Sequence, residues 1–427
     1  MVRLEEHKHS TENKPIEALL LPKRVYLPML QHLGKACQPE VKVGESVLAG
    51  QRIAAATAHV WAPIHSSISG KVVAIQEWPH PVLGRCQSVV IDSDGRDARA
   101  DFKPRKEEEV ARLSADEIRK IVLDAGIVGM GGASFPSHIK LNPPHPVDSL
   151  IINAAECEPY LTGDYRLMLE KAKEIFLGIK VIARCLGVKK IFIGVEDNKP
   201  EAIIKFQELA AQDGEATSVK VLKSAYPQGG EKQLIKNILR KEVPSGKLPF
   251  DIGVVVHNVA TVFAIYEAVY LGKPLYERVV TVTGSCLENP RNLLVRLGTP
   301  IGELIDFCGP LGDGYSRIII GGPMMGITQY TQDVPVIKST TGVILLTEKG
   351  AGEREEEFCI RCGACVRACP VGLMPCLINL ASEKELWKEA KSYQALDCME
   401  CGLCNYVCPA NRKLTQSIKR AKLEVVK

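Results

Sequence analysis

Eight cysteines near the end of the chain form two copies of one spacing, C-x2-C-x2-C-x3-C-P. The first run is CIRCGACVRACP at 359–370, and the second is CMECGLCNYVCP at 398–409. Three thiolates at this spacing wrap one corner of a [4Fe–4S] cube, while the fourth cysteine points to the other cluster. The sequence therefore predicts two clusters with exchanged fourth ligands. The predicted ligands are Cys359, Cys362, Cys365 and Cys408 for cluster 1, and Cys398, Cys401, Cys404 and Cys369 for cluster 2.

Zinc sites and disulfides are the alternatives for these cysteines. Zinc sites use paired C-x2-C units rather than a compact run of four, and disulfide frameworks are typical of small secreted chains. Cys376 follows the first run without fitting its spacing, and we expect a buried thiol there. Of the 15 cysteines, the remaining ones show no pairing pattern, which indicates a reducing, cytoplasmic compartment.

The second group of candidate residues begins with the glycine-rich stretch GIVGMGGASFPSHIKL at 126–141. Its spacing differs from the dinucleotide fingerprint G-x-G-x-x-G. Gly129, Gly131 and Gly132 leave room for backbone N–H groups to approach a phosphate or a flat ring, and Lys140 can supply a charge. A glycine-rich packing turn is the alternative interpretation.

Three further polar stretches follow this loop. They are NAAECEPY at 153–160, YPQGGE at 226–231 and HNVATV at 257–262. The first comes at the end of an apparent strand, and such strand ends line the crevices of open α/β sheets. We expect Cys157 within it to fill space rather than to act as a nucleophile. The candidate side chains in the three stretches are Asn153, Glu156, Glu158, Tyr226, Glu231, Asn258 and Thr261.

The elements that must position these residues form four predicted domains. The fold class is an α/β domain combined with a barrel-sandwich β domain, a small β-grasp domain and an α-helical two-cluster ferredoxin-like domain. In the first domain, 40–75 resembles lipoyl and biotinyl carriers, but no lysine lies between Arg52 and Lys71 to carry a cofactor. The predicted boundaries are 1–105 for the barrel-sandwich hybrid and linker, 106–268 for the α/β domain, 269–349 for the β-grasp domain, and 350–427 for the ferredoxin-like domain with its basic tail.

Within the α/β domain, β-like runs alternate with helical ones. Ser114 and Glu117 predict a capping box for a helix that ends at Gly126. We expect the linker to the last domain at 350–358, one helix between the cysteine runs at 381–396, and a helical tail at 411–427. The expected strands are 149–155, 189–197 and 219–225, and the expected helices are 115–126, 167–187 and 230–242.

Composition narrows the class of protein. The 427 residues are 46% hydrophobic and 24% charged, as in a soluble globular protein of roughly three domains or four small ones. An aromatic share of 5% and a net charge of +4 do not predict a nucleic-acid partner. The N-terminus is not typical of a signal peptide. The apolar stretch 252–271 contains polar residues, and we expect its helical part to be amphipathic rather than membrane-spanning.

The four polar stretches, in this order and followed by a β-grasp domain and cysteine runs, resemble the flavin-carrying NADH-oxidising subunit of respiratory complex I. With the N-terminal segment and both cysteine runs, the whole chain is similar to the C subunits of the Rnf complex, a membrane-bound ferredoxin:NAD oxidoreductase. The resemblance covers about residues 15–420. The loop departs from complex I at Met130 and Ser134, and the following stretch departs at Ala155, which weakens the case for NAD(H) more than the case for flavin.

The resemblance implies noncovalent FMN and NAD(H) in addition to the two clusters. The implied flavin contacts are Gly129, Gly131, Gly132, Lys140, Asn153, Asn258 and Thr261, and the side chains implied to line the flavin and nicotinamide site are Glu156, Glu158, Tyr226 and Glu231. It also implies integral-membrane partners that translocate ions, an iron–sulfur ferredoxin-like partner subunit, and a peripheral place on the cytoplasmic face of the membrane. The alternatives are a soluble flavin and iron–sulfur reductase of the corrinoid or proline reductase type, and a two-cluster relay without flavin.

Overall fold

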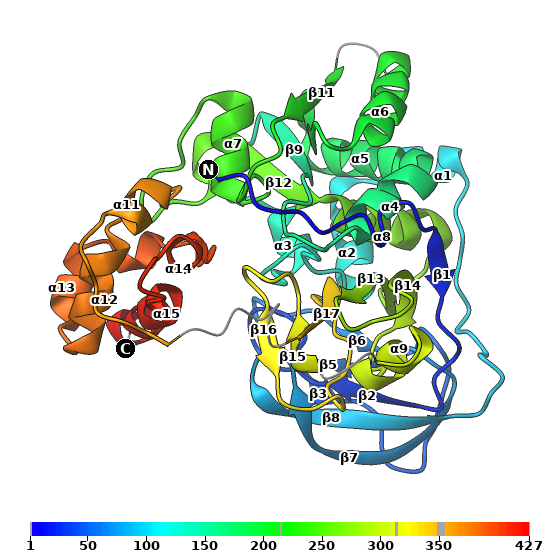
Figure 1. Cartoon of the computed structure of the whole chain (residues 1–427). Helices are drawn as coiled ribbons and strands as arrows, with labels where there is room; N and C mark the ends of the chain where they lie inside the picture. Colours follow the sequence, from blue (N-terminus) through cyan, green and yellow to red (C-terminus); the bar gives the residue numbers. More distant parts are fainter. Residues whose placement is uncertain (1, 214–215, 312–314, 348–354, 427) are drawn as a thin grey trace.

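The computed structural model describes residues 2–213, 216–311, 315–347 and 355–426. Three parts of the chain pack into one body, and the C-terminal helical part lies against its side (Figure 1). Of the predicted linker at 350–358, residues 350–354 lie outside the described residues. Within the described part, no helix is both long and apolar enough to span a bilayer.

The N-terminal β domain has two small sheets, as a barrel-sandwich hybrid requires. Residues 56–63 connect β5 to β6 and contain no lysine. One sheet has the order β2-β8-β7-β4 and the other β3-β5-β6. The strands are β2 (Arg24–Pro28), β3 (Gln38–Pro39), β4 (Ser46–Val47), β5 (Arg52–Ala55), β6 (Ile64–His65), β7 (Gly70–His80) and β8 (Gly84–Ser93).

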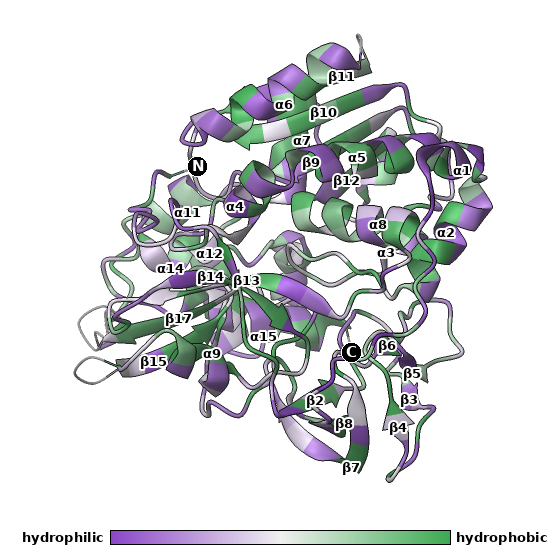
Figure 2. Ribbon diagram, turned by 90° about the vertical axis from the view of Figure 1, so that its right-hand side faces the viewer, coloured by the Kyte–Doolittle hydropathy of each residue, from purple (hydrophilic) through white to green (hydrophobic). Residues whose placement is uncertain are grey.

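The α/β domain is built on a parallel four-stranded sheet with the order β11-β10-β9-β12. Figure 2 shows β10 mainly in the hydrophobic colour and α6 beside it with both polar and apolar residues. The strands are β9 (Ser149–Ala154), β10 (Lys190–Glu196), β11 (Thr217–Leu222) and β12 (Val254–Asn258). The helices are α1 (Glu107–Arg112), α2 (Ala115–Asp124), α3 (Ser137–Lys140), α4 (Gly163–Glu170), α5 (Ala172–Leu186), α6 (Pro200–Gln212), α7 (Glu231–Leu239), the 3-10 turn η2 (Pro249–Ile252) and α8 (Val259–Leu271).

The predicted capping box of α2 is confirmed. Glu117 N–H donates to the Ser114 hydroxyl, and the Glu117 carboxylate accepts from Ser114 N–H. The helix ends at Asp124, two residues before the predicted end, and Gly126 follows the C-cap residue Ala125 with a left-handed φ of 68° that favours glycine.

The expectation of one helix over 167–187 was wrong. Lys171 leaves the helical conformation at φ −131° and separates α4 from α5. Both helices contact α6 and α8, but α4 also packs against β13 and α5 against α2. No proline or glycine stands at Lys171, so the sequence pattern predicts one continuous helix across this position.

The expectation of an amphipathic helix within 252–271 was also wrong. The apolar residues of α8 extend around the helix, and most of its side chains are buried. The reason is that α8 lies between α2 and α5 on one side and the body of the molecule on the other, so it has no wide solvent face.

The β-grasp domain is a mixed six-stranded sheet with the order β1-β14-β13-β17-β15-β16. Its first strand comes from the N-terminus of the chain and pairs in parallel with β14. Its elements are β1 (Ile16–Ala18), β13 (Glu277–Gly284), β14 (Arg291–Arg296), α9 (Ile301–Phe307), β15 (Tyr315–Ile320), β16 (Ile327–Gln329) and β17 (Gly342–Thr347).

The ferredoxin-like domain is a small helical unit with its own hydrophobic cluster. The predicted helix over 381–396 was wrong, because Glu385 adopts φ 57° and the chain turns between α12 and α13 so that both pack on α15. The predicted helical tail is confirmed by α15. The elements are α11 (Ala364–Ala368), α12 (Pro375–Glu383), α13 (Trp387–Ser392), the 3-10 turn η3 (Ala395–Asp397), α14 (Leu403–Tyr406) and α15 (Leu414–Val426).

Candidate functional site

The carboxyl ends of β9 and β12 form the edge on which the candidate site is built. From β9 the chain runs outward through β10 and β11, then crosses back to β12 on the other side of β9. Open α/β sheets bind ligands in the crevice at such a switch point. Asn153 and Asn258 are partners in the parallel register here, so the fold brings two of the predicted site residues together.

The glycine-rich loop packs directly onto the first turn of α8. Met130 N–H donates to the Thr261 hydroxyl at 2.9 Å. A Cβ on Gly131 would lie 2.9 Å from the Asn258 amide group, so this close approach requires glycine. Asn258 caps α8 by accepting from the N–H groups of Ala260 and Thr261. The loop, Asn258 and Thr261 therefore form one unit, as the sequence predicted.

Two glycines of the loop present backbone groups that a ligand could use. Gly131 and Gly132 are exposed, and their N–H groups donate to no protein atom among the residues that the structure describes. A Cβ on Gly132 would meet nothing within 4 Å. Free N–H groups beside a helix N-terminus suit a phosphate, so these residues fit the anionic end of FMN.

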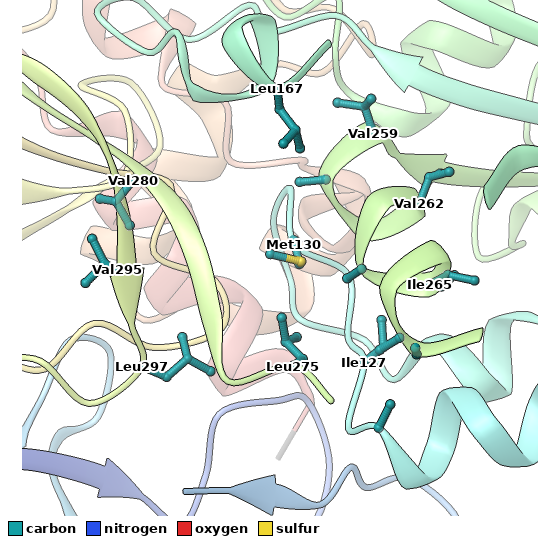
Figure 3. Close-up of a cluster of buried hydrophobic side chains, with 14 of the residues drawn as sticks. Ile127, Met130, Leu167, Val259, Val262, Ile265, Leu275, Val280, Val295 and Leu297 are labelled. Atoms are coloured by element: carbon teal, nitrogen blue, oxygen red, sulfur yellow. The ribbon is translucent and has the colours of Figure 1, made fainter. Parts of the chain in front are cut away.

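Met130, one of the departures from the complex I loop, does not enter the crevice. Its side chain is buried among apolar residues of α8 and the β-grasp strands (Figure 3). The other loop departure, Ser134, lies at φ 53° and is also buried. Neither side chain therefore blocks the exposed glycines.

Lys140 and Glu231 form an ion pair at this edge of the sheet. Lys140 Nζ lies 2.6 Å from a Glu231 carboxylate oxygen, and both side chains are partly exposed. Asn153 Nδ2 donates to Gly229 O at 2.8 Å, which ties β9 to the turn before α7. The stretches that carry these residues, far apart in the sequence, thus meet at one edge.

Glu156 is engaged by the start of α4, and it lines a small hollow together with Lys8, Cys157 and Tyr226. Its carboxylate accepts from the N–H groups of Asp164 and Tyr165 and so caps the start of α4. Burial raises its pKa to about 7, and the nearby charge of Lys8 opposes that shift. Lys8, which the sequence pattern did not single out, is itself buried and donates to Leu161 O at 2.8 Å.

Glu158 and Tyr226 lie where three domains meet. The Glu158 carboxylate accepts from the N–H groups of Met324 and Met325 in the β-grasp domain, at 3.0 and 2.9 Å. The Tyr226 hydroxyl lies 3.4 Å from Glu158 and donates to Cys401 O at 2.8 Å. Because Tyr226 is 2% exposed, its ring packs within the junction.

Cys157 lies in the same junction. Its sulfur accepts from Gly229 N–H at 3.2 Å, and burial raises the pKa of the thiol to about 12. A thiol that stays protonated at neutral pH is a poor nucleophile, as expected for a space-filling cysteine.

The four predicted ligands of cluster 2 surround one hollow. It is otherwise lined mainly by apolar residues, and its thiols are Cys369, Cys398, Cys401 and Cys404. Burial raises the pKa values of Cys398 to about 11 and of Cys401 to about 12, and the charges of the neighbouring cysteines add to both shifts. Cys369 belongs to the first run of cysteines. The structure therefore places the cysteine that is predicted to exchange clusters beside the three cysteines of the second run.

The predicted ligands of cluster 1 lie nearer the surface. Cys359 and Cys362 are exposed, whereas Cys365 is buried. Glu357 N–H donates to Ala410 O at 3.0 Å and thereby ties the chain just before Cys359 to the chain just after Cys408.

Cys376 is half-buried beside Cys365 rather than fully buried as predicted. In the described ranges, no three His, Cys, Asp or Glu side chains are grouped to hold a single metal ion.

Two further residues at the site escaped sequence reasoning. Arg278 on β13 and Lys338 before β17 reach from the β-grasp domain to the carbonyl groups of the glycine-rich loop. Each is a single basic residue without a motif around it, and only the tertiary fold brings them to the loop.

Comparison with known proteins identifies the family to which the whole chain belongs. The C subunit of a proton-translocating ferredoxin:NAD+ oxidoreductase complex from Clostridium ljungdahlii is 46% identical over 99% of this chain and 93% of its own length. The chain belongs to the RnfC family. RnfC relatives from Acetobacterium woodii (Na+-translocating, 45% identical over 98% of this chain and 95% of its own) and Rhodobacter capsulatus (44% over 88% and 73%) match as well.

Domain families match along the RnfC chain in the predicted order. They are the RnfC barrel sandwich hybrid domain at 2–96, the Nuo51 FMN-binding domain at 122–267, the SLBB domain at 279–328 and the 4Fe–4S dicluster domain at 358–412. The predicted fold class is therefore confirmed. The structure of an NAD+-reducing [NiFe]-hydrogenase is similar with a TM-score of 0.51 over 75% of this chain and 63% of that chain, at 19% identity; this likeness concerns the fold alone.

Proposed function

We propose that this chain is the peripheral electron-transfer subunit of a membrane-bound Rnf-type complex, and that it passes electrons between NAD(H), FMN and two [4Fe–4S] clusters. Ion translocation is then carried out by integral-membrane partners, with this subunit on the cytoplasmic face. The names of the Clostridium and Acetobacterium relatives, which are ion-translocating ferredoxin:NAD+ oxidoreductase subunits, support this proposal.

The observation that carries the proposal is the direct contact between the segment 226–239, which also carries Glu231, and the chain around the cluster 2 cysteines. The Tyr226 hydroxyl donates to Cys401 O, and Gln233 on α7 donates to Pro370 O at 2.9 Å, next to Cys369. Both donors belong to the stretch that begins with YPQGGE or to the helix that follows it. A cofactor at the crevice and a cluster at these cysteines would therefore be neighbours.

The residues proposed to hold FMN are the loop glycines, the first turn of α8 and the polar groups around them: Gly129, Gly131, Gly132, Lys140, Asn153, Asn258 and Thr261. Among the glycines, Gly131 and Gly132 are exposed, whereas Gly129 is half-buried and its N–H donates to Phe135 O at 2.9 Å. For NAD(H) we favour the open side of the crevice at Lys140 and Glu231, because the side chains of Glu156, Glu158 and Tyr226 are engaged within the protein. When bound, FMN supplies the exchange between a hydride, which carries two electrons, and the single electrons that iron–sulfur clusters accept.

This arrangement gives an order to the two clusters. Cluster 2 lies on the crevice side, so we assign it as the one that exchanges electrons with the flavin. Cluster 1 then faces the partner. Cys359 is exposed between Phe358 and Ile360, which are 92% and 67% exposed, and large exposed apolar side chains are typical of a docking surface. We propose that an iron–sulfur ferredoxin-like subunit docks there.

Cofactor content and cell fractionation test this proposal. After anaerobic reconstitution, we expect about eight irons and one acid-released FMN per chain, and we expect the native protein to co-purify with integral-membrane subunits. Eight irons without flavin would favour the relay alternative. A protein found wholly in the soluble fraction without partners would favour the soluble reductase.

A further inference from the structure

Two basic side chains of the β-grasp domain lie beneath the glycine-rich loop, and burial lowers the pKa of Lys338 to about 7 and that of Arg278 to about 10. Arg278 is 3% exposed and Lys338 is 0% exposed. Neither one hydrogen-bonds to a carboxylate in the described ranges of the chain. Asp164 attracts Arg278 only through space, since its carboxylate accepts from Asn258 Nδ2 at 2.6 Å. Buried charges are normally paired, so these two call for an explanation.

Both basic side chains contact backbone carbonyl groups of the loop. Lys338 Nζ donates to Gly126 O, where the loop begins, and to Pro63 O in the barrel-sandwich domain, each at 2.7 Å. Arg278 directs Nη1 and Nη2 at Met130 O, both at 3.5 Å, and also bonds Lys338 O. Since 3.5 Å is long for a hydrogen bond, the attraction between Arg278 and the Met130 carbonyl is mainly electrostatic.

This contact fixes the direction of the neighbouring N–H group. The peptide bond between Met130 and Gly131 is trans, and in a trans peptide the C=O and N–H groups point in opposite directions. Because Arg278 attracts the Met130 carbonyl from below, Gly131 N–H points away from the β-grasp domain. The same N–H group has no protein acceptor among the described residues, so it is available to a ligand in the crevice.

We propose that Arg278 and Lys338 are positioning residues for the phosphate of the flavin. They hold the glycine-rich loop with its free N–H groups turned toward an anion, and they place positive charge beneath it that no hydrogen-bonded carboxylate neutralises. A dianionic phosphate above the loop would compensate this charge. The inference rests on the proposed FMN site and adds to it residues from another domain that do not touch the flavin.

A comparison of two flavins tests this role. The full-length protein, with its clusters reconstituted and its flavin removed, is titrated with FMN and with riboflavin, which lacks the phosphate, and binding is followed by flavin fluorescence. We expect Arg278→Met and Lys338→Met each to weaken FMN binding about tenfold while riboflavin affinity changes less than about threefold. Arg278→Lys retains the charge and is expected to bind FMN within about threefold of the wild type.

Arg296→Met is the matched control, because Arg296 lies in the same β-grasp sheet but bonds Ser67 O and Asp97 away from the loop. It should leave both flavin affinities unchanged. An equal loss of FMN and riboflavin affinity in the Arg278 and Lys338 variants, or no loss of either, would overturn the inference. If Arg278→Met does not fold, the flavin affinities of Lys338→Met decide the test. A methionine side chain is close in length to the buried lysine, so this variant is expected to fold. A wild-type protein that binds neither flavin would instead refute the proposed function itself.

Discussion

Individual side chains decide which parts of the predicted site face a ligand. Glu156 and Glu158 stand in one short stretch, and sequence reasoning placed both beside the flavin. In the structure one carboxylate caps a helix and the other accepts from a neighbouring domain. The spacing E-x-E cannot reveal this, because tertiary packing decides which N–H groups donate to the two carboxylates. Here the donors include Asp164 and Met325. Among the loop glycines, Gly131 has a steric reason for its identity, because a Cβ there would lie 2.9 Å from the Asn258 amide group.

Exchange of the fourth ligand is the sharpest expectation at the residue scale. Cys369→Ala removes a predicted ligand of cluster 2 although Cys369 belongs to the first run. We expect the iron content to fall from about eight to about four per chain, with loss of the cluster 2 signal in electron paramagnetic resonance spectra. Cys376→Ala, outside both ligand sets, should retain all the iron. Loss of cluster 1 alone in Cys369→Ala would contradict the exchange.

His257 on β12 makes the fold sensitive to acid. Its side chain is 2% exposed, and burial, assisted by the charge of Lys140, lowers its pKa from 6.5 to about 3. The folded protein keeps this imidazole neutral, whereas the unfolded chain binds a proton below pH 6.5. Its stabilising contribution is therefore complete above pH 6.5 and is lost as the pH falls toward 3.

This one group should reduce the free energy of unfolding by about 2 kcal/mol between pH 7.5 and 5. Urea unfolding of His257→Leu at both pH values measures the effect, since the variant should lose correspondingly less stability than the wild type. Because His32, His65 and His138 also have lowered pKa values, both proteins should still weaken in acid. Equal pH dependence in the two proteins would rule out the role of His257.

At the scale of elements, local patterns predicted most helices and strands but not where they break. The capping box at Ser114 and three strands of the parallel sheet follow from local chemistry and were found, whereas the fourth strand, β12, was not among the expected strands. Lys171 and Glu385 interrupt helices without any proline or glycine nearby. These breaks depend on which neighbour each segment packs against, and that information lies in residues distant in the sequence.

The junction between α7 and the ferredoxin-like domain is the element-scale feature most open to test. Tyr226→Phe keeps the buried ring but removes the hydroxyl that bonds Cys401 O, at a cost of about 1 kcal/mol. We expect hydrogen exchange at 398–404 to become about fivefold faster while exchange within β9 stays unchanged.

Tyr393→Phe is the control. Tyr393 lies in the ferredoxin-like domain, as residues 398–404 do, and it is 38% exposed. It should leave exchange at 398–404 as it is in the wild type. Unchanged exchange in Tyr226→Phe would show that this hydroxyl does not hold the junction.

Across the whole molecule, the N-terminal segment links parts that the sequence treats as separate. Val2 forms a β-bridge with Tyr226, Tyr160 N–H donates to Glu6 O, and β1 completes the β-grasp sheet. Sequence reasoning assigned these residues to the barrel-sandwich part, since nothing in a short polar segment specifies distant partners. The domain types and their order were predictable because each has its own local pattern.

At the scale of the whole molecule, we expect electrons to pass between the crevice and an exposed cluster 1 by way of cluster 2. The measurement that tests this path most directly is an anaerobic titration of the reconstituted chain with NADH, recorded by visible spectroscopy. We expect flavin absorbance to bleach first and cluster absorbance to fall after it. If dithionite bleaches the clusters while NADH changes nothing and acid releases no flavin, the chain alone is a relay and the proposed path is contradicted.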